Sequence, residues 1–222
     1  MGGQERRIKA AARWPDHFED AERMNVSKLL IAGLGGLMLA AGPLAAQGRL
    51  TPNGEQLLKA LRENEGSKAL ALIEKSGSSL VNHRGIDGST PLHVATAKRN
   101  SYWVSYLLQK GADKNTGDRN GDTPLILAAR NGYGEGVAQL LRARADIGRS
   151  NRIGETALIV AVQQRHAPIV STLLKLGADP DKRDHTGYSA REHAQRDTRT
   201  REMLRLIETT KSRASQIAPA KP

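Results

Sequence analysis

The sequence predicts an all-α repeat solenoid, and a fixed internal period is the main reason. Four segments of similar sequence begin at Gly88, Gly121, Gly154 and Gly187, so each starts 33 residues after the one before it. Self-similarity at a period of this length is the signature of repeat architectures. The composition agrees, because aromatic residues make up only 3% of the chain. A chain rich in Ala, Leu and Gly instead suits helices that pack closely through small side chains.

The first helix of each repeat is expected to begin just after a hydroxyl side chain. Such a side chain can accept hydrogen bonds from the free N–H groups at a helix N-terminus, and proline suits the first helical position that Pro91 and Pro124 occupy. Leu92, Leu125 and Leu158 then start an apolar face. The capping residues are Thr90, Thr123, Thr156 and Ser189, and the small residues that let helices approach are Ala95, Ala128, Ala161 and Ala194.

The second helix of each repeat is indicated by paired leucines and apolar residues at helical spacing. The pairs lie at residues 107–108, 140–141 and 173–174. Gly111 and Gly177 fit a left-handed helix end, whereas Arg144 occupies that position in the middle repeat, at a cost of roughly 1 kcal/mol relative to glycine. Gly134 and Gly136 weaken the second helix of the same repeat. Asp113, Asp146 and Asp179 recur once per repeat and are predicted to be turn residues that accept backbone N–H groups.

Both ends of the repeat array look modified, as the ends of a stacked array must be. "NGEQLLKALRENEGSKALALIEKSG" (53–77) predicts two short helices without the signature of the other repeats. At the other end, Ala190-Arg191-Glu192 departs from that signature, and "REMLRLIE" (201–208) predicts a final helix with a polar outer side. The sequence therefore predicts three full repeats between two capping repeats.

Residues 54–208 resemble the ankyrin repeat. The resemblance rests on the 33-residue period, the Thr-Pro-Leu-His run at 90–93, the paired leucines and the Gly-Ala-Asp endings at 111–113 and 177–179. It implies a β-turn finger and two antiparallel helices in each repeat, stacked into a curved solenoid. It also implies that His93 has a structural role.

The resemblance further implies that the chain binds a protein partner through its finger tips and the exposed side of each first helix. Trp103, with Tyr102 and Tyr106, forms the only aromatic cluster and is expected to pack between repeats, with a binding anchor as the alternative. The expected finger contacts are Arg119, Asn120, Asp122, Arg152, Ile153, Glu155, His185, Thr186 and Tyr188, and the expected helix contacts are Lys98, Arg130, Asn131, Gln163 and Gln164.

No motif in the sequence indicates catalysis. There is no G-x-S-x-G, Walker loop or H-E-x-x-H, and His83, His166, His185 and His193 do not have the spacing of metal ligands. The absence of cysteine excludes disulfides, thiolate zinc sites and a cysteine nucleophile. We therefore expect a monomeric binding protein that is not an enzyme and has no cofactor, metal or small-molecule substrate.

The net charge of +11 suggests a second kind of partner. From Lys182 onward there are ten basic and five acidic residues, so the C-terminal end carries about half of the excess. A basic surface attracts anionic partners. The alternative function is therefore binding to phospholipid, polyanionic glycan or nucleic acid through the basic C-terminal cap and tail.

An apolar run near the N-terminus predicts export. The 13 residues Leu29–Ala41 are too short to span a bilayer comfortably, and Lys28 precedes them while small residues follow. Residues 24–46 are therefore predicted to be a signal peptide cleaved after Ala46, and the alternative is an uncleaved anchor formed by Leu29–Ala41. The short signal and the lack of cysteine favour a bacterial periplasm over a eukaryotic secretory route.

The remaining segments lie outside the predicted repeat domain. Residues 1–23 have mixed charge and make a poor leader, so Met24 is the expected start of translation. Residues 47–53 are expected to be a linker. Residues 209–222 are polar and contain two prolines, which predicts a disordered basic tail.

Overall fold

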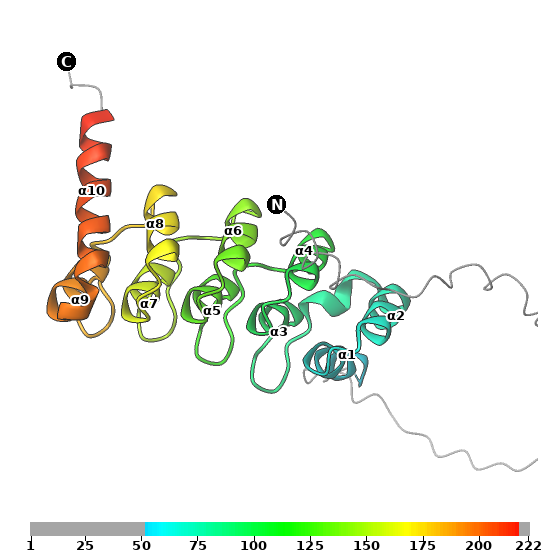
Figure 1. Ribbon diagram of the computed structural model, residues 1–222. Helices are drawn as coiled ribbons and strands as arrows, with labels where there is room; N and C mark the ends of the chain where they lie inside the picture. Colours follow the sequence, from blue (N-terminus) through cyan, green and yellow to red (C-terminus); the bar gives the residue numbers. More distant parts are fainter. Residues whose placement is uncertain (1–51, 218–222) are drawn as a thin grey trace, which may run out of the picture. The chain divides into compact units, whose positions relative to one another are not determined.

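The structure is a computed structural model that describes residues 52–217, which form ten α-helices and two short 3-10 helices (Figure 1). Isolated bridges pair Ser150 with Thr156 and Arg183 with Ser189, and no longer strand occurs within residues 52–217. The α-helices are α1 (Pro52–Arg62), α2 (Gly66–Ser76), α3 (Pro91–Ala97), α4 (Ser101–Gln109), α5 (Pro124–Arg130), α6 (Gly134–Arg142), α7 (Ala157–Gln163), α8 (Ala167–Lys175), α9 (Ala190–Arg196) and α10 (Arg201–Ile217), and the 3-10 helices are η1 (Gly77–Asn82) and η2 (Thr198–Thr200).

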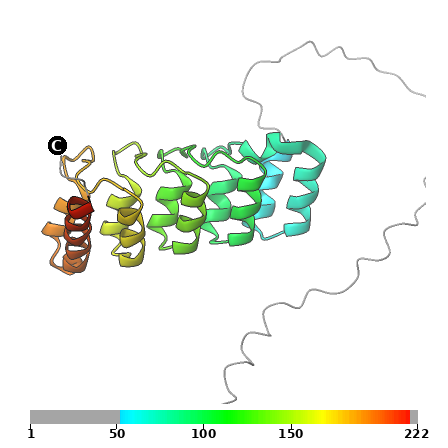
Figure 2. The same cartoon turned by 90° about the horizontal axis from the view of Figure 1, so that it is seen from above.

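The helices stack in two rows. Helices α1, α3, α5, α7 and α9 each contact the next along one row, and α4, α6, α8 and α10 do so along the other. Each first helix also packs against the second helix of its own repeat, so the pairs follow one another as units (Figures 1 and 2). This confirms an all-α repeat solenoid, in which the three full repeats α3–α4, α5–α6 and α7–α8 lie between two modified ends.

The hydroxyl caps lie where the sequence places them. Thr90, Thr123, Thr156 and Ser189 are the N-cap residues of α3, α5, α7 and α9, and each hydroxyl accepts the backbone N–H three residues further on. Pro91 and Pro124 begin their helices as predicted. Each cap satisfies one N–H group that the helix itself leaves free.

Leucines and alanines of both helix rows form the core. Leu92, Leu125 and Leu158 are at most 1% exposed, and the four repeated alanines are at most 2% exposed. Trp103 is 6% exposed, and its ring lies 3.9 Å from the Cβ position of Gly66 in α2, so it packs against the preceding repeat as expected. The equivalent position in the middle repeat is Gly136, and there the buried ring of Tyr133 occupies the space that a side chain would fill.

The turns between helices repeat as well. Gly111, Arg144 and Gly177 all have a positive φ, at 85°, 61° and 89°, so Arg144 keeps the left-handed geometry of the two glycines. A second set with positive φ was not predicted and consists of Arg99, Gly132 and Arg165. The carboxylates of Asp113, Asp146 and Asp179 each accept the backbone N–H two residues further on, as predicted for turn residues.

The last helix is longer than the sequence predicts. Helix α10 continues to Ile217, into the segment 209–222 for which the composition predicts a disordered tail. A helix that has already formed extends at little cost, and the first proline beyond α10 is Pro219. The predicted leader (1–23), the predicted signal peptide (24–46) and nearly all of the predicted linker (47–53) lie outside the described residues.

Candidate functional site

Four β-turn fingers, at residues 85–89, 118–122, 151–155 and 184–188, line one side of the repeat array. In each finger the first residue donates its backbone N–H to the carbonyl of the fifth, at 2.9 to 3.0 Å. Neighbouring fingers are also joined: the backbone N–H groups of Arg119, Arg152 and His185 donate to the carbonyls of Asp87, Asn120 and Ile153, at 2.9 to 3.0 Å. These bonds hold the fingers edge to edge. We call the surface formed by the fingers and the exposed side of the first helices the finger face.

The glycine in each of the first three fingers is required by its surroundings. Gly121 and Gly154 have φ values of 78° and 82°, in the left-handed region that favours glycine. A Cβ on Gly121 would lie 2.8 Å from the backbone nitrogen of Arg152, and one on Gly154 would lie 2.7 Å from that of His185. A side chain at either position would therefore push the next finger away.

A polar side chain at the start of each of the last three fingers closes its tip. One oxygen of Asp118 accepts the backbone N–H groups of Asn120 and Asp122, and Asn151 and Asp184 do the same in the next two fingers. These three residues were not among the expected site residues. Their spacing of 33 residues was the signal that could have identified them.

Asp122 was expected to contact a partner, but the structure buries it. Its side chain is 4% exposed, and its two oxygens form a bidentate pair with Arg130 at 3.0 Å. Asn151 of the next finger also donates to it, at 2.9 Å. Arg130 approaches Glu155 as well, at 3.7 Å, so Asp122, Arg130 and Glu155 form one ion-pair cluster between two fingers. The prediction for Asp122 was wrong because its charge is used inside the protein.

Most of the other expected contact residues are exposed. Ile153 is 57% and Tyr188 37% exposed, and both lie on fingers. Gln163 and Glu155 are only partly exposed. The exposed polar members are Lys98, Arg119, Asn120, Asn131, Arg152, Gln164, His185 and Thr186.

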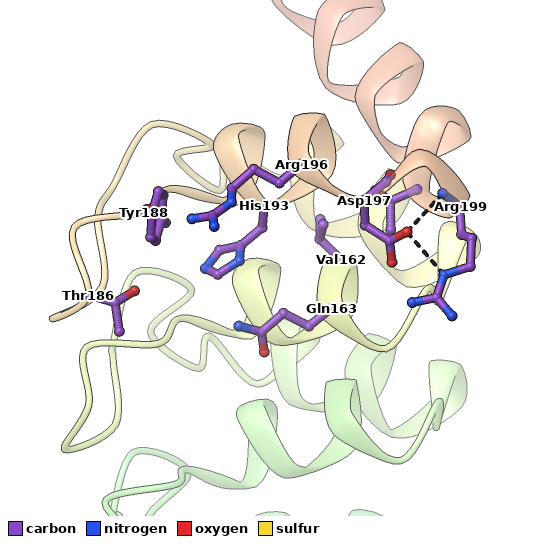
Figure 3. A pocket seen from close by; sticks show the side chains of 9 residues that line it. Val162, Gln163, Thr186, Tyr188, His193, Arg196, Asp197 and Arg199 are labelled. Carbon is purple, nitrogen blue, oxygen red and sulfur yellow. Dashed lines mark hydrogen bonds and ion pairs between the residues drawn. The ribbon is translucent and has the colours of Figure 1, made fainter.

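Two hollows bring some of these residues together. The smaller hollow, of about 320 Å³, lies between the second and third fingers and contains the ion-pair cluster with Arg119, Asn120, Arg152 and Ile153. The larger, of about 680 Å³, joins Gln163 of α7 to Thr186 and Tyr188 of the last finger and to residues of α9 (Figure 3). Lys98, Asn131, Gln164 and His185 line neither hollow. We call the larger one the C-terminal hollow, and its complete lining is Val162, Gln163, Thr186, Tyr188, His193, Arg196, Asp197, Arg199 and Thr200.

His193 and Asp184 form a pair beside the C-terminal hollow. The Nε2 atom of His193 lies 2.8 Å from a carboxylate oxygen of Asp184, whose side chain is 3% exposed. Burial raises the pKa of Asp184, but hydrogen bonds from Thr186, His193 and Tyr188 outweigh it and lower the pKa to about 2. Asp184 therefore stays ionised, and its charge helps to hold the last finger to α9.

Arg196 lies over the ring of Tyr188 on one side of the C-terminal hollow. The guanidinium carbon of Arg196 lies 4.2 Å from the centre of the Tyr188 ring, and His193 meets the same ring edge to face at 5.8 Å. Figure 3 shows the three side chains on the finger side of the hollow, with Asp197 and Arg199 paired at its other end. Arg196 was missed because the sequence marked its repeat as a cap, although it aligns with Arg130 and Gln163.

His93 lies in the core and has the structural role that was expected. It is 2% exposed; its Nε2–H donates to the carbonyl of Asp122 at 2.8 Å, and its Nδ1 accepts from the backbone N–H of Thr90. Burial lowers its pKa, which favours the neutral ring that these two bonds require.

Neither metal ligands nor a membrane span is found in residues 52–217. No group of three or more His, Asp or Glu side chains there could hold a metal ion. None of the helices described in this range is both long and apolar enough to cross a bilayer.

A family model described as ankyrin repeats (three copies) matches residues 53–151 and 120–184. The two matches overlap and together cover more than half of the chain. No curated protein matches the sequence.

Proposed function

Because the chain belongs to the ankyrin-repeat family, we propose that it binds another protein through the finger face and has no catalytic activity of its own. Ankyrin repeats generally mediate protein–protein interaction, and ankyrin-repeat proteins are typically non-catalytic scaffolds. The monomeric chain would present its finger residues at fixed spacing to one partner.

The bonding of the fingers is the observation that carries this proposal. Backbone bonds between fingers, side-chain bonds within each tip and close-packed glycines hold the exposed residues in place before any partner arrives. A preformed surface loses little conformational entropy on binding. Ile153 and Tyr188 add exposed apolar area beside the exposed Arg119 and Arg152, a mixture common at protein interfaces.

Affinity capture from a periplasmic extract tests the finger face. The full chain is compared with a variant that carries Arg119→Ala, Arg152→Ala and Tyr188→Ala, and the variant should lose the partners that the wild type recovers. A matched control carries Arg142→Ala, Arg149→Ala and Tyr102→Ala, which also removes two exposed arginines and one tyrosine but leaves the fingers intact. If the finger variant and the wild type recover the same partners, the finger face is not the binding surface.

Salt dependence separates this function from binding to anionic surfaces. Polyanion binding falls steeply between low and moderate ionic strength, whereas a partner held by aromatic and apolar contacts is much less sensitive. In the C-terminal part, Arg183, Arg191 and Arg199 are each paired with a carboxylate. This pairing reduces the charge available to a polyanion and supports the protein-binding proposal.

The proposed compartment is the bacterial periplasm, after cleavage of the signal peptide at residues 24–46. N-terminal sequencing of the protein from a periplasmic fraction should begin at Gln47. Recovery of an intact N-terminus in the membrane fraction would instead support an anchor formed by Leu29–Ala41. Intact-mass analysis of a precursor blocked in export tests Met24 as the start, and a peptide from residues 5–20 would contradict it.

A further inference from the structure

Arg130 and Arg196 occupy the same position in two different repeats. They lie 66 residues apart, which is two periods, and each is the last residue of its first helix, α5 or α9. The finger residue opposite Arg130 is Asp122, and the residue two periods after Asp122 is Tyr188. The two arginines therefore have the same place in the fold, but Arg130 faces a carboxylate and Arg196 faces an aromatic ring.

The charge of Arg130 is neutralised within the protein. It forms a bidentate pair with Asp122 at 3.0 Å and lies 3.7 Å from Glu155. A guanidinium that already holds two carboxylates has little left to offer a third. The intervening repeat has Glu155 and Gln163 at these positions, so it has a carboxylate but no arginine.

The charge of Arg196 has no such partner. Its guanidinium lies 4.2 Å above the ring of Tyr188, and among residues 52–217 no carboxylate forms an ion pair with it. A guanidinium over an aromatic ring keeps its N–H edge free, because the ring face satisfies the charge without using the donors. Arg196 thus keeps the fork of donors that binds a carboxylate through two parallel hydrogen bonds.

The rest of the C-terminal hollow is already bonded, except near Arg196. Thr186 and His193 bond to Asp184, Asp197 bonds to Arg199, and Thr200 bonds to backbone carbonyls. In the described part of the chain, no hydrogen bond engages the Gln163 amide, the Tyr188 hydroxyl or the Arg196 guanidinium. Figure 3 shows these three side chains around the same side of the hollow, contributed by α7, the last finger and α9.

We propose that the C-terminal hollow binds an aspartate or glutamate side chain of an extended segment of the partner protein, with Arg196 as its main contact. The proposal rests on the function proposed above and names the chemistry of the partner. Tyr188 holds the guanidinium flat, and Gln163 and the Tyr188 hydroxyl supply further donors. Ile153 on the neighbouring finger is 57% exposed, so an apolar residue beside the acid would find a contact there.

Selection of random peptides on the immobilised full chain tests the proposal. The wild type should enrich peptides that contain Asp or Glu, and Arg196→Gln should lose that enrichment. Arg142→Gln is the matched control, because Arg142 is an exposed arginine at the end of α6 with no ion pair among the described residues. Thermal unfolding followed by circular dichroism shows whether each variant is folded.

A double-mutant cycle then tests direct contact. Replacing the acid of a selected peptide by its amide should weaken binding to the wild type about tenfold or more, and should leave binding to Arg196→Gln unchanged. Equal weakening for both proteins, or no acidic enrichment by the wild type, overturns the proposal. Arg196-dependent binding of a short single-stranded DNA without peptide enrichment also overturns it. Peptides that need Arg119 and Arg152 but not Arg196 would overturn this inference and leave the proposed function standing.

Discussion

The ring of Tyr133 lies against the backbone of Gly136, three residues further along the chain. A Cβ on Gly136 would come within 2.3 Å of two ring carbons, closer than real side chains approach. Trp103 and Ile169 fill the equivalent position in the neighbouring repeats, with 6% and 3% exposure. In the middle repeat, the ring of Tyr133 therefore fills the space that the side chains of Trp103 and Ile169 fill in the neighbouring repeats.

We predict that Gly136→Ala destabilises the protein although alanine favours helices. Tyr133 is 4% exposed and has little room to move, so the added methyl overpacks the site. A net loss of about 1–2 kcal/mol is expected after the gain in helix propensity. Gly134→Ala is the control, because a Cβ there meets no atom within 4 Å, and it should be neutral or stabilise by about 0.5 kcal/mol. Urea unfolding measures both; equal effects of the two changes would contradict the packing argument.

Arg144→Gly should stabilise the protein by up to about 1 kcal/mol. Arg144 has a φ of 61° at the end of α6, a conformation that glycine adopts without steric cost. Gly111→Ala tests the same effect in reverse, since φ at Gly111 is 85° and nothing lies near its missing Cβ. It should cost about 1 kcal/mol through backbone strain alone. Thermal or urea unfolding that shows the opposite sign for either variant would refute this account.

The Asp184 carboxylate should make the free energy of unfolding depend on pH in the acidic range. Its pKa is lowered from 3.8 to about 2 in the folded protein, so its contribution is fully present above pH 3.8 and is lost as the pH falls through about 2. The contribution is about 2 kcal/mol.

Asp184→Asn is the variant that isolates this charge. Asn151 occupies the equivalent position in the preceding finger and accepts the equivalent backbone N–H groups, so an amide can close the turn. The variant should be less stable than the wild type at neutral pH, and the difference should shrink toward pH 2. Urea unfolding of both proteins between neutral pH and pH 2 measures this difference. A stability difference that stays constant over this range would show that the Asp184 charge does not stabilise the fold.

Helix α6 should exchange its amide hydrogens faster than α8. Gly134 and Gly136 give α6 a weaker helical preference than the residues at the same positions of α8, and glycine favours local opening. Val137 and Val170 are equivalent and both fully buried, so their amides form a fair pair for comparison. Hydrogen exchange that shows uniform protection along both helices would contradict this prediction.

The sequence predicts those parts of the fold that are determined by residues close together along the chain. The caps at Thr90, Thr123, Thr156 and Ser189, the left-handed end at Arg144 and the turn aspartates each depend on residues within a few positions along the chain. A 33-residue period repeats these local causes, so the number and order of repeats followed from it. Helix α10 runs further than the composition of residues 209–222 predicts, because an existing helix extends at little cost and the first proline beyond it is Pro219.

The candidate site was predictable only in outline. The sequence located the fingers along the chain, and their contact with a partner stays a prediction. It treated Asp122 and Arg130 as two separate contacts, whereas they are bonded to each other. It also omitted Arg196, whose repeat looked like a cap.

The sequence by itself determined the architecture, because the period, the caps and the apolar spacing act over short distances. Tertiary structure decided which charges remain for a partner. Arg130 and Arg196 share one position in the repeat, and only the finger that packs opposite distinguishes them: Asp122 neutralises the first, whereas Tyr188 supports the second and leaves its donors free. That difference depends on side chains eight residues apart meeting across a folded finger, and on Asn151 and Glu155 arriving from the next repeat.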